Sequence, residues 1–426
     1  MIDQIYRHFL ESSGVFTDSR TSVDRGVFFA LSGPNFNGNK FAKVALEGGA
    51  KIAIIDDPDF KRDERFILVE DALETLQALA RLHRSNFKGP VIGLTGSNGK
   101  TTTKELIAEV LKTKFQIIAT EGNLNNHIGV PLTLLRIKES TEIAVIEMGA
   151  NHIGEIELLC SIAQPSHGLI TNIGKAHLEG FGSYEGVLRG KSELYDFLLK
   201  SDGQVFINSL DPVLRNMGRR FDKPFYYPQK GDYFHCEMIS SNPYLCIKTD
   251  IGKEINTQLI GEYNFANVAT ALCLGKYFEV PARVAEEAVS KYVPEMNRSQ
   301  VVKKGTNMII LDAYNANPES MSVALKNLGK MEAKSKVVIL GDMLELGADE
   351  IIEHERLGEA VNQINPDKVY FCGQLVKHSA VLVAGSDYYK TKDELTKHLK
   401  TQTINDSLIL IKASRGIGLE SLIDLF

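Results

Sequence analysis

The chain of 426 residues lacks several features that mark special classes of protein. Its five cysteines are odd in number and widely scattered, so we expect neither a disulfide framework nor a Cys-x-x-Cys metal site. No run of about 18 apolar residues occurs, and the first residues do not combine a basic stretch with an apolar block. We therefore expect no signal peptide, no membrane-spanning segment and a reducing, cytoplasmic location.

Positive charge is not in excess either. The chain carries 48 Lys plus Arg against 54 Asp plus Glu, a formal net charge of −6. This balance provides no overall basic field that would attract nucleic acid or anionic lipid, so neither is expected as a partner. Hydrophobic residues make up 43% and charged residues 24%, values close to those of globular proteins, which argues against extensive disorder.

What the chain does contain is a regular alternation of short apolar runs and helix-length intervals. In the first segment, predicted strands at 26–31 and 51–55 flank a helix near 40–48. In the second segment, strands are predicted at 91–94, 143–146, 169–173 and 205–208. In the third, they are predicted at 308–311, 337–340, 369–372 and 408–411. Such alternation is typical of parallel sheets covered by helices on both faces, so the predicted fold class is α/β with two doubly wound sheets.

The same pattern suggests three domains. We predict a small α/β domain over 1–85, a central domain over 86–297 and a third domain over 298–426. The second boundary follows a plausible hinge at 292–297, where Pro294 and its polar neighbours interrupt the periodicity.

A glycine-rich loop lies between a predicted strand and a helix, and it reads Gly96-Ser97-Asn98-Gly99-Lys100-Thr101. In this context glycines let backbone N–H groups converge on phosphate oxygens, and the helix N-terminus adds its positive end. Lys100 would supply a mobile cation and Thr101 a hydroxyl for Mg²⁺. The loop departs from G-x-x-x-x-G-K-[ST], because Leu94 stands where the first glycine is usual. ATP is favoured over GTP, since no N-K-x-D motif occurs; a turn that only connects strand and helix is the alternative.

Two further side chains are predicted at the same sheet edge. Glu147 ends an apolar strand and His177 follows the next predicted strand, so both should emerge near the phosphate loop, where α/β sheets bind ligands. A carboxylate there suits Mg²⁺. A solvated acid and a structural histidine are the alternatives.

Several segments, in order along the chain, resemble signatures of the Mur ligase superfamily. They are T-G-S-N-G-K-T-T (95–102), N-L-N-N-H-I-G-V-P (123–131), E-M-G-A-N-H (147–152), N-I-G-K-A-H-L-E (172–179), K-S-E (191–193) and G-E-Y-N-F-A-N (261–267). Two later segments, D-A-Y-N-A-N-P-E-S-M (312–321) and L-G-D-M-L-E-L-G (340–347), resemble the members that add a dipeptide. One departure is Asn37-Gly38-Asn39, where the family usually has D-G-H.

This resemblance implies three domains: an N-terminal UDP-sugar domain, a central P-loop ATPase-like domain and a C-terminal Rossmann-like domain. It further implies a monomeric, ATP- and Mg²⁺-dependent ligase that joins D-alanyl-D-alanine to UDP-N-acetylmuramoyl-tripeptide through an acyl phosphate. A related ligase that adds a single amino acid or glutamate, and a nucleotide-switched binding module, are the alternatives. The third peptide residue, diaminopimelate or lysine, stays open.

The resemblance also implies site residues. For ATP they are Gly96, Ser97, Asn98, Gly99, Lys100, Thr101, Thr102, Asn264, Asn267, Arg298 and Asp312. For metal they are Thr101, Glu147, His177 and Lys191, the last as a carbamate formed with CO₂. For catalysis they are Lys100, Glu147, His177 and Lys191. For the nucleotide-peptide and dipeptide substrates they are Ser19, Arg20, Tyr314, Asn315, Lys412, Ser414 and Arg415.

Overall fold

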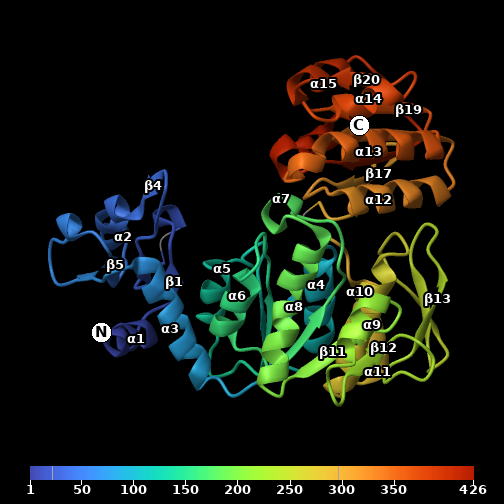
Figure 1. Ribbon diagram of the computed structural model, residues 1–426. Coiled ribbons are helices and arrows are strands. Elements are labelled where there is room, and N and C mark those ends of the chain that lie inside the picture. The colour runs from blue at the N-terminus through green and yellow to red at the C-terminus, as the bar shows by residue number, and fades with distance from the viewer. Residues whose placement is uncertain (22, 296) are drawn as a thin grey trace.

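The computed structural model describes residues 1–21, 23–295 and 297–426. These residues form three bodies, each built around its own main sheet (Figure 1). The predicted hinge at 292–297 contains Met296, which lies outside the described residues. No helix in the described ranges is long and apolar enough to cross a membrane.

The N-terminal body has a small parallel sheet in the order β1-β2-β5-β6. Its strands are β1 (Val15–Phe16), β2 (Val27–Phe29), β5 (Ile52–Ile55) and β6 (Phe66–Leu68), with a separate hairpin of β3 (Ser32–Gly33) and β4 (Phe36–Asn37). Its helices are α1 (Ile2–Leu10), α2 (Ala42–Glu47) and α3 (Ala72–Asn86). The two predicted strands and the predicted helix are confirmed. Because α3 also packs against α5 (Gly129–Leu134) and α6 (Glu155–Ala163), it links this body to the next.

The central sheet is entirely parallel, in the order β12-β11-β10-β7-β9-β8. Its strands are β7 (Val91–Thr95), β8 (Ile117–Ala119), β9 (Ile143–Glu147), β10 (His167–Ile170), β11 (Gln204–Asn208) and β12 (Phe225–Tyr227). The remaining helices of this body are α4 (Lys100–Leu111), α7 (Leu178–Phe181), α8 (Tyr184–Lys200), α9 (Pro212–Gly218), α10 (Asn264–Tyr277) and α11 (Ala282–Lys291). The predicted parallel sheet is confirmed.

Successive residues of β7 explain why both faces are covered. Val91 belongs to the core under α3, α6 and α8, whereas Ile92 points to the opposite core under α4 and α10. β10 ends at Ile170, three residues before the predicted end. Beyond it the chain turns to the phosphate loop, where the Ser97 N–H donates to the Asn172 carbonyl at 3.0 Å.

A three-stranded antiparallel sheet was not predicted. It consists of β13 (Cys236–Ser240), β14 (Cys246–Thr249) and β15 (Glu254–Asn256). β13 and β15 are largely exposed, β14 has only four residues, and none of the three contains a continuous apolar run, so periodicity gave little signal. Leu245, Ile247 and Ile255 anchor it to the core beside α10 and α11.

The C-terminal body is a second doubly wound sheet, as predicted, and its strand order is β16-β17-β21-β18-β19-β20. The edge strands β16 and β20 were not predicted. Only the edge strand β16 runs antiparallel to its neighbour. The strands are β16 (Gln300–Lys304), β17 (Asn307–Asp312), β18 (Ser335–Gly341), β19 (Lys368–Cys372), β20 (Asp387–Tyr389) and β21 (Ser407–Lys412). The helices are α12 (Pro318–Lys330), α13 (Glu350–Ile364), α14 (Lys377–Leu382) and α15 (Lys392–Leu399).

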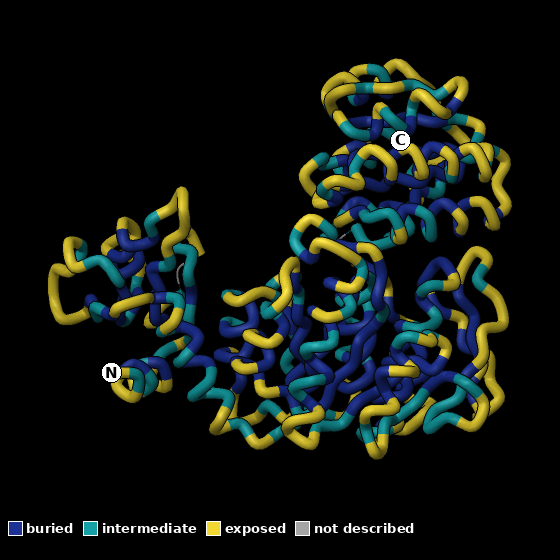
Figure 2. The backbone as a smooth tube through the Cα atoms, in the orientation of Figure 1, coloured by how far each residue is buried: buried dark blue, intermediate teal, exposed yellow. Residues whose placement is uncertain are grey.

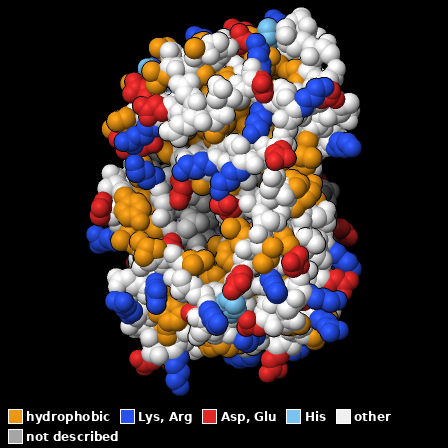
Figure 3. All heavy atoms as spheres, turned by 90° about the vertical axis from the view of Figure 1, so that its right-hand side faces the viewer, with side chains coloured by type: hydrophobic (Ala, Val, Ile, Leu, Met, Phe, Trp, Pro, Cys, Tyr) orange, Lys and Arg blue, Asp and Glu red, His pale blue; other side chains and the backbone are white. Residues whose placement is uncertain are grey.

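Burial follows this division into bodies. The sheet strands form dark, buried interiors inside each body, and the connecting loops are exposed (Figure 2). On the face shown in Figure 3, acidic and basic side chains are interspersed rather than gathered by sign. This mixture agrees with the small net charge of −6.

Candidate active site

A cavity of about 740 Å³ lies between the central and C-terminal bodies. The carboxyl ends of β7 and β9 reach it from one side and those of β17 and β21 from the other. The predicted site residues that line it are Ser97, Asn98, Gly99, Lys100, Thr101, Thr102, Glu147, His177, Asn264, Asn267, Arg298, Asp312, Tyr314, Asn315 and Lys412. The cavity therefore brings together residues predicted for ATP, metal and acceptor.

The phosphate loop is held in shape from outside. Gly96 has φ +147, and a Cβ there would overlap the Thr171 hydroxyl, so only glycine fits. The backbone N–H of Asn98 donates to the side-chain oxygen of Asn172 at 2.9 Å. Gly99 has φ +76 and begins α4, which leaves the first N–H groups of that helix facing the cavity. The loop thus presents a preformed anion site.

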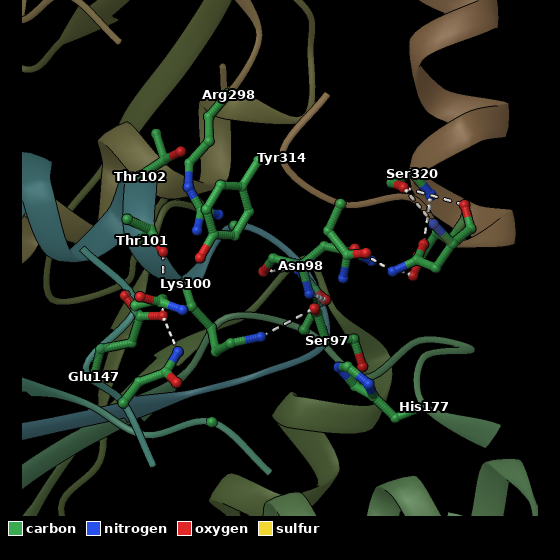
Figure 4. Close-up of a pocket in the computed structure, with 18 of the residues that line it drawn as sticks. Ser97, Asn98, Lys100, Thr101, Thr102, Glu147, His177, Arg298, Tyr314 and Ser320 are labelled. Atoms are coloured by element: carbon green, nitrogen blue, oxygen red, sulfur yellow. Dashed lines mark hydrogen bonds between the residues drawn. The ribbon is translucent and has the colours of Figure 1, made fainter. Parts of the chain in front are cut away.

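Lys100, the first residue of α4, folds back over this loop. Its Nζ donates to the carbonyl oxygens of Gly96 at 2.7 Å and Ser97 at 3.2 Å (Figure 4). Burial lowers the pKa of Lys100, the charge of Glu147 raises it and that of Arg298 lowers it. An anion bound in the loop would favour the charged form of Lys100, because its negative charge offsets the cost of burying the ammonium.

Glu147 ends β9 directly beneath the loop. Its Oε1 accepts hydrogen bonds from Thr101 Oγ1 at 3.1 Å and Asn125 Nδ2 at 2.8 Å. Its Oε2 is buried and has no hydrogen-bond partner in the described part of the chain. A buried carboxylate oxygen without a partner beside a hydroxyl suits a hard cation such as Mg²⁺.

The described residues contain no group of three or more His, Cys, Asp or Glu side chains that could hold a metal ion. The protein would therefore supply few ligands, as is usual for Mg²⁺, which keeps several waters and substrate phosphates.

His177 reaches the same cavity from the loop after β10. It has φ +53, and its Nδ1 lies 2.5 Å from Oε2 of Glu345 in the C-terminal body. The other ring nitrogen, Nε2, takes no part in this contact. The ring points toward the phosphate loop in Figure 4.

Lys191 does not line the cavity itself. It is buried in α8, and its Nζ donates to the carbonyl of Ala150, a residue that does line the cavity, at 3.1 Å. The same Nζ lies 5.2 Å from the ring centroid of Phe181. Burial, and then the charge of Lys100, lower the pKa of Lys191 well below its ordinary value. The side chain is therefore more easily held as a neutral, nucleophilic amine than a surface lysine.

Asn264 and Asn267 are three residues apart and lie on one face of α10. Asn267 Nδ2 donates to Asn264 Oδ1 at 2.9 Å, and Asn267 Oδ1 accepts from Thr103 Oγ1 at 3.0 Å. Asn264 Nδ2 donates to the Ile260 carbonyl at 2.8 Å. These bonds fix both amides against α4 at the cavity wall.

The C-terminal body contributes a cationic and aromatic wall. The guanidinium of Arg298 lies 3.6 Å from the ring centroid of Tyr314 (Figure 4). The guanidinium of Arg415 lies 5.4 Å from the same centroid. Lys412 Nζ is paired with Asp312 Oδ2 at 2.6 Å. The Arg298 Nε is buried without a hydrogen-bond partner among the described residues, so it can donate to a ligand anion.

Five predicted residues besides Lys191 do not line the cavity. Ser19 and Arg20 lie in a short 3-10 helix of the N-terminal body, where Arg20 is exposed and pairs with Asp18 at 2.7 Å. Ser414 is buried, and its Oγ accepts from the Leu344 N–H at 3.0 Å. Gly96 begins the phosphate loop, where its carbonyl accepts from Lys100 Nζ, and the Arg415 guanidinium lies near the Tyr314 ring.

Sequence reasoning missed four cavity or interface residues. Asn125 donates to Glu147, and Asn172 holds the phosphate loop. From the C-terminal body, Glu319 contacts Asn98 of the loop and Glu345 contacts His177. All four stand inside or at the edge of the motifs quoted above. The motifs could have identified these four residues as candidates, but they could not have shown which residues each one contacts.

Comparison with protein families gives two matches. Residues 94–275 match "Mur ligase middle domain", and residues 297–415 match "Mur ligase, glutamate ligase domain". Similar full-length proteins include UDP-N-acetylmuramoyl-tripeptide–D-alanyl-D-alanine ligases. The one from Bacillus subtilis is 36% identical and the one from Escherichia coli 33%, each match covering 96% of this chain and 92% of the relative.

Solved structures that are similar to this chain lead to the same family. A crystal structure of MurF from Acinetobacter baumannii is similar with a TM-score of 0.86 and 30% identity, covering 96% of this chain and 92% of that one. MurF ligase from Thermotoga maritima, crystallised in complex with ADP, has a TM-score of 0.86 and 28% identity, covering 98% and 97%.

Proposed function

Because this chain belongs to the Mur ligase family, we propose that it joins D-alanyl-D-alanine to UDP-N-acetylmuramoyl-tripeptide with hydrolysis of ATP to ADP and phosphate. The observation that carries this proposal is the shared cavity. It places a phosphate loop from one body against Arg298, Tyr314 and Lys412 from another. An enzyme that joins two substrates at the expense of ATP needs such a meeting point.

The reaction brings two anions together, the γ-phosphate of ATP and the terminal carboxylate of the tripeptide. Lys100 and the N–H groups of the loop bind the phosphates, and Arg298 neutralises charge from the opposite wall. The carboxylate attacks the γ-phosphorus and ADP leaves, which yields an acyl phosphate. The dipeptide amine then attacks the acyl carbon and phosphate leaves. Closure of the C-terminal body excludes water that would hydrolyse the acyl phosphate.

Thr101 and Glu147 would hold Mg²⁺, and His177 with Lys191 would support a second metal position. The metal supplies positive charge for the phosphate oxygens. Asn264 and Asn267 would face the adenine, and Asp312 would face the ribose.

We place a carbamate on Lys191. The buried amine, with its lowered pKa, attacks CO₂ and loses one proton, so that a cation becomes an anion near the metal position. Mass spectrometry of the native protein with and without bicarbonate would detect the added CO₂. Absence of both the carbamate and any bicarbonate-dependent gain in activity would contradict this assignment.

The remaining assignments concern the substrate-binding residues, the domain boundaries, the oligomeric state and the cellular location. Tyr314, Asn315, Lys412, Ser414 and Arg415 would bind the dipeptide, and Ser19 with Arg20 would bind the UDP group. The domains are 1–85, 86–297 and 298–426. The enzyme would act as a monomer in the cytoplasm, where ATP is available.

The decisive assay combines ATP, D-alanyl-D-alanine and UDP-N-acetylmuramoyl-tripeptides that carry diaminopimelate or lysine. We expect a pentapeptide product by mass spectrometry and phosphate release that requires both peptide substrates. Product with single amino acids in place of the dipeptide would indicate a different ligase. Phosphate release without either peptide would indicate a nucleotide switch.

A further inference from the structure

Glu319 projects from the C-terminal body into the cavity. It is the second residue of α12 and precedes Ser320 in the chain. Its Oε2 accepts a hydrogen bond from Asn98 Nδ2 of the phosphate loop at 2.8 Å. A Cβ built on Gly174 would overlap the same carboxylate, so Glu319 is wedged between the phosphate loop and the loop that carries His177.

The other carboxylates of the cavity are engaged elsewhere. Asp312 is paired with Lys412, and Glu155 accepts backbone N–H groups at the start of α6. Glu147 accepts two side-chain hydrogen bonds and is the expected metal ligand. Glu319 accepts one hydrogen bond from a neutral amide, and its Oε1 has no hydrogen-bond partner within the described ranges.

The ligase reaction requires a proton acceptor at this place. The amine of a peptide has a pKa of about 7.7 to 8.0, so near neutral pH most of the dipeptide enters as an ammonium without a lone pair. The proposed dipeptide contacts Tyr314, Asn315 and Lys412 come from the same body as Glu319. The acyl phosphate forms at the phosphate loop, which Glu319 touches through Asn98.

We propose that Glu319 is the general base that activates the attacking amine; this inference rests on the proposed ligase function. The dipeptide ammonium transfers one proton to the free Oε1, and its nitrogen lone pair forms the C–N bond. The C–O bond to phosphate then breaks, and the phosphate leaves with that electron pair and the second ammonium proton. Glu319 afterwards releases its proton to solvent.

The electrostatic setting is compatible with this role. Burial raises the pKa of Glu319, the hydrogen bond from Asn98 lowers it, and the charge of Asp211 raises it. A carboxyl with a raised pKa is a stronger base than an exposed one. The other titratable or charged side chains that line the cavity are Lys100, His127, Glu147, Glu155, His177, Tyr263, Arg298, Asp312, Tyr314 and Lys412.

The test compares Glu319→Gln, Glu319→Asp and the control Asp393→Asn. Glutamine can still accept the Asn98 hydrogen bond but cannot take a proton, whereas aspartate can. Asp393 is an exposed acid in the first turn of α15, so its variant measures the effect of losing a helix-end charge. We expect amide formation to fall about 10²- to 10⁴-fold in Glu319→Gln, less in Glu319→Asp, and to stay unchanged in the control.

Hydroxylamine distinguishes a defect in deprotonating the amine from a defect in forming the acyl phosphate, because it is a nucleophile that is already unprotonated at neutral pH. We expect Glu319→Gln to trap the acyl phosphate as hydroxamate at the wild-type rate. Its amide formation should rise about tenfold per pH unit below the amine pKa, since only the free amine reacts. Equal losses of hydroxamate and amide, or a wild-type amide rate in Glu319→Gln, would overturn the assignment. Failure of the wild type to form any amide would instead overturn the ligase function as well.

Discussion

At the scale of single residues, Lys100 is the most direct test of the phosphate loop. Its ammonium is buried and donates to two loop carbonyls, and burial lowers the pKa of Lys100. We expect Lys100→Ala to lower the rate of phosphate release by about 10²- to 10³-fold or more, because such contacts stabilise transition-state charge by ~3 kcal/mol. Lys112→Ala, at the other end of α4, is the control. Near-normal turnover of Lys100→Ala would remove the loop from the mechanism.

His167, also a single-residue feature, predicts a pH dependence of stability. It is buried at the start of β10, and its ring contacts Ser166 Oγ at 2.9 Å and Tyr277 OH at 3.1 Å. Burial lowers the pKa of His167 to about 4, whereas an unfolded histidine titrates near 6.5. Below pH 6.5 the unfolded state therefore binds the proton more readily than the folded state. Stability should fall as pH drops from 6.5 toward 4, by up to roughly 3 kcal/mol.

Calorimetry of the wild type and His167→Gln between pH 7 and 4.5 checks this expectation. The variant lacks the titrating ring, so its melting temperature should depend less steeply on pH, even if it is lower throughout. Parallel pH profiles for the two proteins would refute the role of His167.

At the scale of elements, the turn from β7 to α4 depends on Gly96. Alanine there would adopt φ +147 and meet the Thr171 hydroxyl, whereas Gly154 combines φ +92 with open space. Gly154→Ala should therefore show backbone strain alone, roughly 1–2 kcal/mol. We expect Gly96→Ala to lose more stability and also its affinity for ATP. Thermal denaturation and titration with a non-hydrolysable ATP analogue measure both. Equal behaviour of the two variants would show that the approach to Thr171 is unimportant.

At the scale of the whole molecule, the cavity lies between the central and C-terminal bodies, which contact each other beside it. Asn98 contacts Asn317 and Glu319 at 2.8 Å each, and Lys175 contacts Glu353 at 3.2 Å. A nucleotide bound between the bodies adds contacts to both. At one hundred times its Kd, ADP should raise the free energy of unfolding by about 2.7 kcal/mol.

Differential scanning calorimetry with increasing ADP provides this measurement. Because Lys100→Ala weakens binding, it should need more ADP for the same shift in melting temperature. A transition that involves the C-terminal body and does not respond to ADP would argue that the nucleotide binds the central body alone.

The sequence by itself determined the elements and the loop. Apolar runs located the four inner strands of each doubly wound sheet, since only strands buried on both faces are apolar without interruption, whereas the edge strands β8, β12, β16 and β20 were not predicted. It also placed Glu147 at the end of β9, because the end of an apolar run is a local property of the sequence. The sheet β13-β14-β15 was not predicted because its strands are short and two of them, β13 and β15, bury few side chains.

Only the tertiary structure decided which distant residues meet. Lys412 pairs with Asp312 because β21 lies beside β17, although 100 residues separate them in the chain. Glu319 reaches Asn98, and Glu345 reaches His177, because the C-terminal body docks on the central one. Such contacts depend on how whole surfaces pack, and no spacing within one segment encodes them. The phosphate loop and Glu147 could therefore be predicted from the sequence, whereas the contacts of Glu319 with Asn98 and of Glu345 with His177 appeared only in the fold.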